Sequence, residues 1–368
     1  MSKILFHLNC LEQGGAERVV SNLANAFAAN GDEVVVATEW KGENEFTLDE
    51  RVKRLIVGLT HKDEKRSRIT KVFIREKYLK NCIKKEKPDI VIAFAQNAIY
   101  RALMAVRRID VPVIIAVRTD PVGHYDRKID KIMIPLTYRR ADGAVFQTKG
   151  QRDFFPDYIA KNSEIILNPV NEKYLRVPEP EKREKAVVHA GRIVDFKNQP
   201  MLIDAFMKVH ERFPEHELRI YGPDSFDGTL DILKEKIAQY KAENYIKLMG
   251  ASDSLEKELP KGEVYAFSSD WEGLPNALIE AMALGLPTVS TDCPCGGPAT
   301  VMTDGIDGLL VPVGDADAMA DGICRLLEDK ELAKRLGTNA RRIEDRVNSQ
   351  AIIKQWHEYI DRVIESRK

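Results

Sequence analysis

The stretch that decides the fold spans residues 4–38 and reads ILFHLNCLEQGGAERVVSNLANAFAANGDEVVVAT. It begins with an apolar run at 4–8, crosses a loop with two glycines, and enters 16–29, where apolar residues recur at helical spacing. The segment 33–38 is then rich in valine, which favours a strand. A strand, a helix and a second strand in this order predict parallel strands covered by helices.

The same alternation continues through the rest of the first half of the chain and then restarts. Further strands are predicted at 52–57, 90–94, 113–117 and 143–147, before a break near 168–170 and a stretch rich in proline and charge that ends at Lys185. After this linker we expect strands at 186–190, 217–221, 246–249, 264–267, 287–290 and 308–311. Helices are expected at 199–212, 227–243, 277–284, 316–328 and 330–342.

Two successive α/β patterns predict two doubly wound, Rossmann-like domains, residues 1–170 and 171–348. In such sheets ligands bind outside the carboxyl ends of the strands, and with two domains the cleft between them is the natural site. A long final helix at 349–368 carries Trp356. The pattern alone does not decide whether this helix packs back on the first domain.

Length and composition agree with this organisation. The chain has 368 residues, 44% of them hydrophobic, and a single core rarely grows beyond about 250–300 residues. No stretch approaches the roughly 18 apolar residues that a membrane span needs, and the N-terminus lacks the cleavage site of a signal peptide. We therefore expect a cytoplasmic protein.

The five cysteines form an odd and scattered set: Cys10, Cys82, Cys293, Cys295 and Cys324. This pattern does not suit a disulfide framework, which agrees with a reducing compartment. The spacing of Cys293 and Cys295 is not that of a zinc knuckle, and no second Cys/His pair lies nearby in sequence. We predict no metal site.

The net charge of −1 hides an asymmetry between the two halves. Residues 1–170 hold 29 basic and 22 acidic residues, a balance of +7, whereas the remainder holds 27 basic and 35 acidic residues, a balance of −8. Within the first half, the segment 62–87 has 11 basic and 4 acidic residues interleaved with apolar ones. This split indicates that the N-terminal half meets something anionic.

Three segments follow strands and have residues suited to binding an anion or a sugar. In the first, Gly14 and Gly15 open a helix and let backbone amides approach a ligand, although a tight turn alone would also explain them. In the second, residues 189–198, Arg192 and Lys197 could bind phosphate oxygens, although ordinary surface charges remain an alternative.

The third segment, residues 268–289, starts where an apolar strand stops. Gly273 and Pro275 shape a loop, and Asn276 is placed to cap the helix that follows. Glu272 lies on the loop and Glu280 about one turn into the helix, so two carboxylates are available for the hydroxyls of a sugar or ribose. The alternative for Glu280 is a helix surface charge, which the apolar residues after it disfavour.

Glu272 and Glu280, with seven residues between them in EGLPNALIEAMALGLPTV, resemble the E-x7-E signature of the retaining glycosyltransferases of family 4, which have the GT-B fold. The loop from Gly14 to Arg18, Gly191-Arg192 with Lys197-Asn198, and the segment 305–312 are similar to the family at matching positions. The resemblance runs nearly end to end, and its most specific part is the E-x7-E block.

The resemblance implies a metal-independent transfer of a hexose or N-acetylhexosamine from a nucleotide-sugar, UDP-linked, with retention of configuration. It implies that Glu272 contacts the donor sugar, that Glu280 binds the ribose, and that Arg192 and Lys197 neutralise the diphosphate, with Glu272, Arg192 and Lys197 forming the catalytic set. The other implied donor-binding residues are Gly15, Gly273, Leu274, Asn276, Gly296 and Gly297.

Two positions depart from the family pattern. Where many members carry a histidine at the end of an N-domain strand, this chain has Arg118, followed by Asp120. These two residues, with Gly14 and Glu17, are the candidates for the acceptor side. Many members carry an acid three residues after the glycine pair that corresponds to Gly296-Gly297, and this chain has Thr300 there. The family's hydrogen bonds in the donor pocket therefore carry over to this chain only in part.

The acceptor implied by the resemblance is a glycan or a polyprenyl-diphosphate-linked saccharide. The basic segment 62–87 favours reversible docking on an anionic membrane surface, with a solvated charged helix as the alternative. No nucleic acid is expected, because the basic excess is local and has no stacking aromatic platform. A sugar-nucleotide epimerase, a phosphorylase and a non-catalytic sugar-nucleotide-binding protein remain alternative functions.

Overall fold

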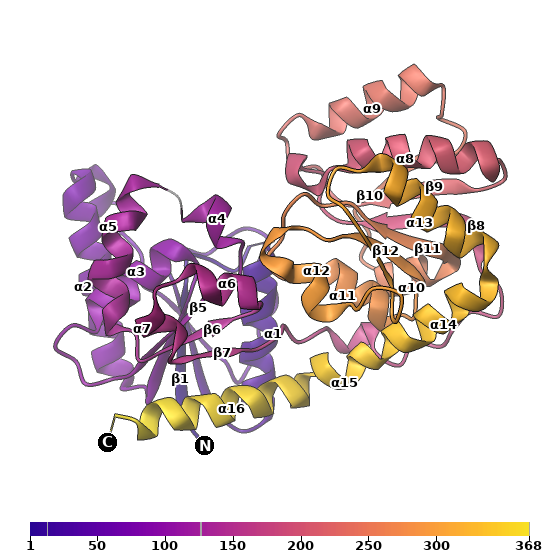
Figure 1. The fold of residues 1–368 in the computed structure, drawn as a ribbon. Helices are drawn as coiled ribbons and strands as arrows, with labels where there is room; N and C mark the ends of the chain where they lie inside the picture. The colour runs from indigo at the N-terminus through magenta and orange to yellow at the C-terminus, as the bar shows by residue number, and fades with distance from the viewer. Residues whose placement is uncertain (13, 126, 368) are drawn as a thin grey trace. The chain divides into compact units, whose positions relative to one another are not determined.

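A computed structural model describes residues 1–12, 14–125 and 127–367. It divides the chain into two compact units. Unit 1 comprises Met1–Pro169 together with Ser349–Lys368, and unit 2 comprises Val170–Asn348. Each unit is an α/β domain built on one parallel sheet, as the alternation of strands and helices predicts (Figure 1).

Unit 1 is built on a seven-stranded sheet in the order β3-β2-β1-β4-β5-β6-β7. The strands are β1 (Lys3–Leu8), β2 (Glu33–Thr38), β3 (Lys53–Ile56), β4 (Ile90–Phe94), β5 (Val113–Ala116), β6 (Gly143–Phe146) and β7 (Ser163–Ile165). Strand β1 pairs in parallel with both β2 and β4, so that the chain reverses its direction of winding beside β1. This reversal is the switch point at which ligands bind in such sheets.

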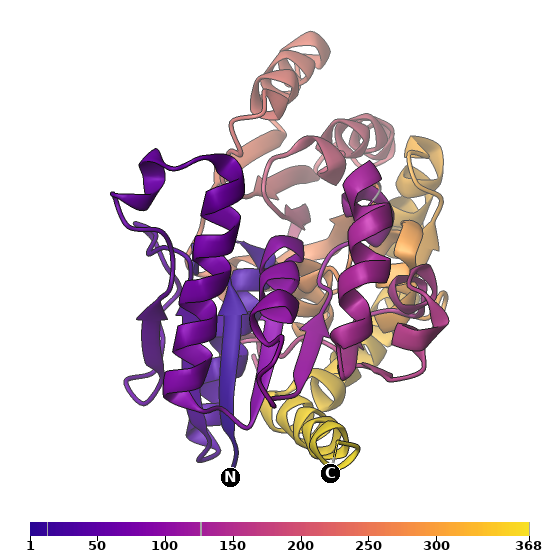
Figure 2. The same cartoon turned by 90° about the vertical axis from the view of Figure 1, so that its left-hand side faces the viewer.

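Helices cover both faces of this sheet. On one face lie α2 (Arg68–Glu86), α3 (Gln96–Ala105) and α5 (Lys128–Thr137), which are in front of the strands in Figure 2. On the other face α1 (Gly15–Ala29) and the final helix α16 (Ser349–Glu365) pack together. The short helices α4 (Pro121–His124), α6 (Lys149–Phe154) and α7 (Asp157–Ala160) complete the unit.

The final helix belongs to unit 1, a placement that the sequence pattern left open. Trp356 is fully buried and its ring lies 6.5 Å from that of Phe94. The Tyr359 hydroxyl accepts a hydrogen bond from the Ala144 amide at 2.7 Å and donates one to the Asn162 carbonyl at 2.6 Å. These buried contacts fasten α16 to the strands β4 and β6.

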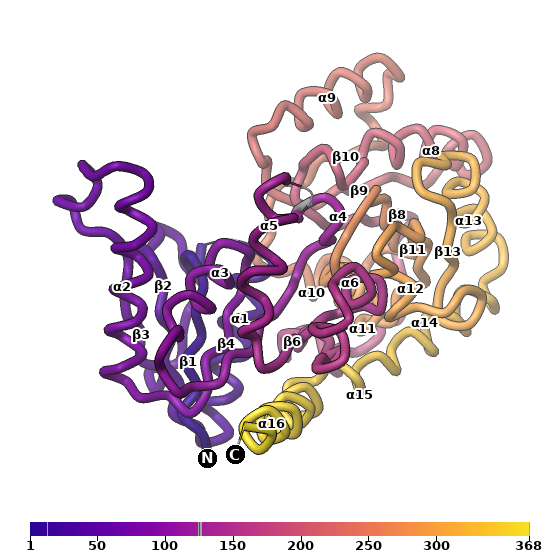
Figure 3. Tube along the Cα trace, turned by 60° about the vertical axis from the view of Figure 1, so that its left-hand side comes forward, coloured from indigo at the N-terminus to yellow at the C-terminus, as the bar shows by residue number. Residues whose placement is uncertain are grey.

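Unit 2 is built on a six-stranded parallel sheet in the order β10-β9-β8-β11-β12-β13. Figure 3 shows the path of the chain through this unit. Its strands are β8 (Glu184–Ala190), β9 (Glu217–Tyr221), β10 (Ile246–Gly250), β11 (Gly262–Phe267), β12 (Thr288–Thr291) and β13 (Leu309–Val311). Its main helices are α8 (Gln199–Arg212), α9 (Thr229–Tyr240), α11 (Asn276–Ala283), α13 (Ala316–Glu328) and α14 (Lys330–Ala340). Buried residues of α8, α9, α13 and α14 form one hydrophobic core with the sheet.

Several element boundaries differ from the sequence predictions. The helix predicted at 227–243 begins only at Thr229, because the Asp227 carboxylate accepts a hydrogen bond from the Thr229 amide and Gly228 has a φ of +92°. Strand β7 was not predicted. The basic segment 62–87 contains a short turn before α2, which starts after Ser67, whose hydroxyl caps the Thr70 amide.

Candidate functional site

The switch point of unit 2 lies between β8 and β11, which are neighbours in the sheet. The loops that leave the carboxyl ends of these two strands contain residues 191–198 and 268–275. These are two of the segments that sequence analysis singled out. Parallel α/β sheets bind ligands at this position because two neighbouring loops diverge there and leave backbone groups exposed.

The loop after β8 contains two cations five positions apart, the exposed Arg192 and the partly buried Lys197. The Gly191 amide donates to the Tyr221 carbonyl at 2.9 Å, and a Cβ on Gly222 would come within 1.8 Å of the Gly191 oxygen, so the backbones of the two loops approach closely. The Arg192 carbonyl accepts a hydrogen bond from Gln199 Nε2 at 2.9 Å, which fixes its backbone. The Arg192 side chain remains exposed.

Lys197 and Glu272, 75 residues apart in sequence, form an ion pair. Their side chains are only 12% and 14% exposed, so water screens the pair incompletely. The Lys197 ammonium lies 5.3 Å from the centre of the Phe267 ring, and Ser269 Oγ donates to Glu272 Oε1 at 3.3 Å. A cation and a carboxylate are therefore held together at the switch point.

A second set of contacts ties the two loops together around this pair. Asn198 Nδ2 donates to Asp270 Oδ1 at 2.6 Å, and the Asp270 amide donates to the Phe196 carbonyl at 2.8 Å. The rings of Phe196 and Trp271 stack with centres 4.1 Å apart. Ser268 Oγ donates to the Lys197 carbonyl at 2.8 Å. These contacts hold Lys197 and Glu272 in place before any ligand binds.

The helix after this loop, α11, contains Glu280, which is 5% exposed. It is thus not the solvated surface charge of the alternative interpretation. The prediction that Asn276 caps this helix is wrong, because the extended residue before the helix is Pro275 and Asn276 is its first residue. The preceding Leu274 is buried, with 6% of its surface exposed.

The glycine pair Gly296-Gly297 lies directly against the loop of Glu272. A Cβ on Gly297 would come within 2.1 Å of the Gly273 carbonyl oxygen, so only glycine allows this approach. Gly296 has a φ of +70°, and it precedes the short helix α12 (Gly297–Val301). Thr300, in the place of the family's acid, donates through Oγ1 to the Gly296 carbonyl at 2.6 Å.

One residue near this site was given no role by the sequence analysis. His189, at the end of β8, is fully buried, and its Nδ1 lies 2.9 Å from the Ala266 carbonyl. Its Nε2 has no hydrogen-bond partner within the part of the chain that the structure describes. Burial lowers the pKa of His189 to about 4, with Lys197 contributing in the same direction, so the imidazole is neutral at pH 7.

In unit 1 the first glycine loop opens α1, which begins at Gly15 after the extended residue Gly14. Glu17 lies in the first turn, and its carboxylate covers Gly14, where an added Cβ would come within 2.1 Å of it. Gly15 has an open environment, since a Cβ there would meet nothing within 4 Å. An exposed helix N-terminus is thus accompanied by an acidic side chain.

Arg118 occupies a largely apolar environment in unit 1. Its guanidinium lies 5.3 Å from the Phe94 ring and 5.7 Å from the Trp356 ring, and Nη1 donates to Asn168 Oδ1 at 3.2 Å. Burial lowers the pKa of Arg118 to about 9. Asp120 is 4% exposed and its carboxylate accepts a hydrogen bond from the Val122 amide at 3.1 Å, which caps α4. Their roles toward an acceptor stay predictions.

A polar cluster at the carboxyl ends of β1 and β2 was missed by the sequence analysis. Arg101 donates to Asn9 Oδ1 at 2.6 Å and pairs with Glu39 at 3.0 Å, while Arg75 pairs with the same carboxylate at 2.7 Å. Burial raises the pKa of Glu39 against the opposing effect of both arginines. Burial, followed by the nearby Arg101, lowers the pKa of His7 to about 3.

Two family models match this chain. Residues 13–174 match the model described as Glycosyltransferase Family 4, and residues 170–343 match the one described as Glycosyl transferases group 1. Together they cover residues 13–343. The chain is a glycosyltransferase with a family 4 domain followed by a group 1 domain. The predicted E-x7-E resemblance is thereby confirmed at the level of the family and of its GT-B fold.

Relatives of this glycosyltransferase include bacterial enzymes of glycan assembly. In Campylobacter jejuni, GalNAc-alpha-(1->4)-GalNAc-alpha-(1->3)-diNAcBac-PP-undecaprenol alpha-1,4-N-acetyl-D-galactosaminyltransferase is 24% identical, over 93% of this chain and 93% of its own length. The amylovoran biosynthesis glycosyltransferase AmsD of Erwinia amylovora is 23% identical over 98% of this chain and 100% of its own.

Solved structures share the fold of this glycosyltransferase. Anabaena HepE in complex with UDP and glucose superposes with a TM-score of 0.82 at 20% identity, over 98% of this chain and 100% of that one. A sucrose-phosphate synthase from Thermosynechococcus elongatus gives the same TM-score at 18% identity, with 100% of both chains covered. At these identities the likeness establishes the GT-B fold.

Proposed function

We propose that unit 2 binds a UDP-linked sugar and that the enzyme transfers a hexose or N-acetylhexosamine from it without a metal ion and with retention of configuration. The observation that carries this proposal is the Lys197–Glu272 ion pair at the switch point between β8 and β11. The complexes of HepE with UDP and with UDP-glucose support the choice of nucleotide.

The proposed roles follow from the exposure and charge of each side chain. The exposed guanidinium of Arg192 is free to bind the donor diphosphate, and Lys197 stays within reach of the diphosphate while Glu272 holds it. Glu272 binds hydroxyls of the donor sugar, and the buried Glu280 binds the ribose. The backbone amide of Gly297 adds an uncharged donor near the diphosphate. The Gly296 amide, which the sequence also predicts as a donor, already donates to the Cys293 carbonyl at 3.2 Å.

Chemically, this arrangement stabilises the leaving group. As the bond between the anomeric carbon and the diphosphate breaks, negative charge grows on the phosphate oxygens, and two cations fixed beforehand lower the energy of that charge. This supplies a physical reason for transfer without a metal ion. For a retaining reaction, we expect the acceptor hydroxyl to approach on the same face, with a donor phosphate oxygen assisting its deprotonation.

The proposed acceptor is a glycan or a polyprenyl-diphosphate-linked saccharide at an anionic membrane surface. The names of the Campylobacter and Erwinia relatives support this class. On α2, Ile69, Val72 and Phe73 are 73%, 57% and 62% exposed, amid the basic residues of 62–87. No helix among the described residues is long and apolar enough to cross a bilayer. Basic and apolar groups on one surface suit interfacial docking.

The experiment that tests the donor site is a screen of UDP, GDP, ADP and their sugars for thermal stabilisation of the full chain. A donor that binds the folded state raises the unfolding midpoint by mass action, and UDP and its sugars are expected to give the largest shift. The best donor is then incubated with and without an undecaprenyl-diphosphate-linked saccharide. A new glycosidic bond is expected only with the acceptor.

Other products would change the conclusion. A changed sugar nucleotide formed from the donor alone would indicate an epimerase, and phosphorolysis of a glycan would indicate a phosphorylase. Stabilisation by every nucleotide to the same extent, or unchanged stabilisation by UDP in an Arg192→Gln and Lys197→Gln double variant, would overturn the proposed donor site. A Lys234→Gln variant serves as the matched control, because Lys234 is exposed on α9.

A further inference from the structure

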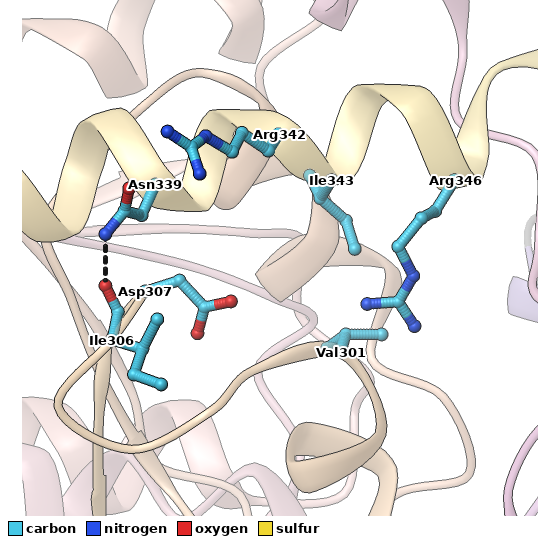
Figure 4. A pocket seen from close by; sticks show the side chains of 7 residues that line it. All are labelled: Val301, Ile306, Asp307, Asn339, Arg342, Ile343 and Arg346. Carbon is cyan, nitrogen blue, oxygen red and sulfur yellow. Dashed lines mark hydrogen bonds between the residues drawn. The ribbon is translucent and has the colours of Figure 1, made fainter.

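Unit 2 has a pocket of about 210 Å³ that none of the predicted donor residues lines (Figure 4). Its walls come from the helical segment 339–346 on one side and from the loop 301–307 on the other. The lining residues are Val301, Ile306, Asp307, Asn339, Arg342, Ile343 and Arg346. The volume lies below the roughly 300–1,000 Å³ of pockets for drug-sized ligands, so a small molecule would fill it.

Two arginines, one helical turn apart, give the pocket its positive charge. Arg342 and Arg346 are both exposed, and no carboxylate lies within ion-pair distance of either guanidinium in the part of the chain that the structure describes. Arg346 Nη2 donates to the Thr300 carbonyl at 3.1 Å. The remaining guanidinium N–H groups are available to an oxyanion, which arginine binds through paired hydrogen bonds.

The opposite wall is rigid and contains a carboxylate. Asp307 Oδ1 accepts a hydrogen bond from the Thr303 amide at 2.6 Å, and Asn339 Nδ2 donates to the Ile306 carbonyl at 2.8 Å. Burial raises the pKa of Asp307, while Arg346 acts in the opposite direction. Asp307 would repel a bare anion close by, but its carboxylate suits the hydroxyl groups of a ligand whose charge lies at the other end.

We propose that this pocket binds a phosphorylated sugar, with its hydroxyls on Asp307 and its phosphate on Arg346 and Arg342. The exposed Arg342 side chain points toward Asn339 and away from Arg346 in Figure 4, so it has to turn toward Arg346 when the phosphate binds. Val301, Ile306 and Ile343 line the pocket with apolar groups that suit the carbon face of a sugar ring. A neutral sugar lacks the group that the two arginines bind, and inorganic phosphate lacks the hydroxyls. The proposal does not rest on the identity of the donor nucleotide.

The pocket is connected to the glycine pair Gly296-Gly297 through a series of contacts. Arg346 donates a hydrogen bond to the Thr300 carbonyl, and the Thr300 hydroxyl donates one to the Gly296 carbonyl. The next residue, Gly297, lies against Gly273 in the loop of Glu272. A phosphate that draws Arg346 away from Thr300 removes a hydrogen bond from α12. Occupancy of the pocket therefore changes the affinity for UDP, and by linkage UDP changes the affinity for the sugar phosphate.

The test is isothermal titration of the full chain with glucose 6-phosphate, fructose 6-phosphate and glucose 1-phosphate, with glucose and inorganic phosphate as matched probes. At least one sugar phosphate is expected to bind about ten-fold or more tightly than either matched probe. Arg342→Gln and Arg346→Gln are each expected to weaken that binding by about ten-fold or more, the effect of losing one charged pair. Arg335 is exposed on α14, and Arg335→Gln is expected to change the affinity for the sugar phosphate by less than about two-fold.

Three results would overturn the site. The first is that none of the sugar phosphates binds, and the second is that Arg335→Gln weakens binding as much as the two pocket variants do. The third is that Arg192→Gln abolishes sugar-phosphate binding while Arg342→Gln leaves it unchanged. The last result would place the phosphate among the donor residues instead. The coupling has its own readout, which is the UDP dissociation constant at saturating sugar phosphate. It is expected to shift in the wild type and not in Arg346→Gln, and an unchanged constant in the wild type overturns the coupling.

Discussion

The ion pair between Lys197 and Glu272 is the residue-scale feature on which the proposed chemistry depends. Both side chains are mostly enclosed, and their partners on both loops are themselves hydrogen-bonded. In such an environment the loss of one charge leaves the other unbalanced and incompletely hydrated. Loss of either side chain is therefore expected to change both the stability of unit 2 and the turnover, and the two effects have to be measured separately.

We predict that Lys197→Ala lowers kcat by about 10²–10³-fold, the usual effect of removing one group that stabilises developing charge. Glu280→Ala should chiefly weaken UDP binding, since a ribose contact is the same in the ground state and the transition state. Steady-state kinetics with UDP titrations on both variants separate these effects. Wild-type turnover in Lys197→Ala would remove this residue from the catalytic set, and Lys234→Ala is the control for the loss of a surface lysine.

The buried histidine of unit 2 makes a prediction about pH. His189 has a pKa of about 4 in the folded state against about 6.5 when unfolded, so between these values the unfolded chain binds the extra proton. Its contribution to stability is therefore complete above pH 6.5 and is lost as the pH falls toward 4, with a slope of about 1.4 kcal/mol per pH unit within that window.

The measurement is urea unfolding of the wild type and of His189→Gln between pH 4.5 and 7.5. The free energy of unfolding should fall less steeply with acidification in the variant, because glutamine does not titrate. His210→Gln, which replaces a half-buried histidine on α8, serves as the comparison. Parallel pH profiles for the wild type and His189→Gln would contradict the assignment.

The sequence indicated the residue types at the donor site but not their contacts. Glycines, acids and cations after predicted strands were visible because strand ends are where such sheets bind ligands. The pairing of Lys197 with Glu272 could not be seen across a sequence separation of 75 residues, since it depends on β8 and β11 being neighbours. His7, His189 and Glu39 were missed because a single polar residue beside an apolar strand has no periodic signal.

At the scale of elements, the glycine pair before α12 shows how closely two loops approach. Gly297→Ala places a methyl group 2.1 Å from the Gly273 carbonyl oxygen, so one of the two loops has to move. We predict weakened UDP binding and a loss of about 1–3 kcal/mol of stability, the usual cost of overpacking. Calorimetry and UDP titration measure both effects. Gly123→Ala is the control, because a Cβ there meets nothing within 4 Å.

Two helices of unit 1, α2 and α5, present apolar side chains to solvent. Besides Ile69, Val72 and Phe73 on α2, the residues Ile129, Ile132 and Leu136 of α5 are 53%, 58% and 62% exposed at helical spacing. Figure 2 shows α2 and α5 on the same face of the sheet. The basic segment 62–87 is visible in the sequence, whereas the apolar residues of α5 could not be recognised as exposed, because their spacing equally suits a buried face.

We predict that the full chain floats with liposomes that contain anionic lipid, and that salt weakens the association because it screens the basic residues. Replacing Ile69, Val72 and Phe73 together by serine should reduce the floated fraction several-fold, since their burial in the interface is lost. Ile232→Ser, on an exposed position of α9, is the control. Flotation that is absent, or equal with neutral and anionic lipid, would contradict the docking surface.

The strands were predictable where their residues are buried on both faces of the sheet. Strands such as β4 and β5 read as unbroken apolar runs, and the structure buries every residue in them. Strand β7 has three residues at the sheet edge, all half-buried, and gave no such run. The ends of α9 were misplaced because the turn chemistry of Asp227 and Gly228, rather than the apolar pattern, decides where that helix begins.

At the scale of the whole molecule, the two units repeat one design. Each sheet places its first strand between its second and fourth strands, and each has a glycine-containing loop after that first strand. The sequence predicted this repetition and the break near 168–170, and the boundary lies between Pro169 and Val170. The return of the final helix to unit 1 could not be predicted, because an amphipathic helix with a tryptophan packs equally well on any apolar sheet face.

This return makes the stability of unit 1 depend on the end of the chain. Trp356 is fully buried beside Phe94, so Trp356→Ala removes a large side chain from the core and is expected to cost about 3–5 kcal/mol. The loss should fall on unit 1, because Trp356 and its aromatic partner Phe94 both belong to that unit. UDP binding, which depends on unit 2, should then persist while sugar transfer declines.

Differential scanning calorimetry with and without UDP checks this separation. UDP should raise the midpoint of the transition that belongs to unit 2 in both proteins, and Trp356→Ala should lower only the other transition. Lys354→Ala is the matched control on the same helix, since Lys354 is 79% exposed. If Trp356→Ala abolished UDP binding together with transfer, the two units would not be independent in stability, and the donor site would depend on the final helix as well.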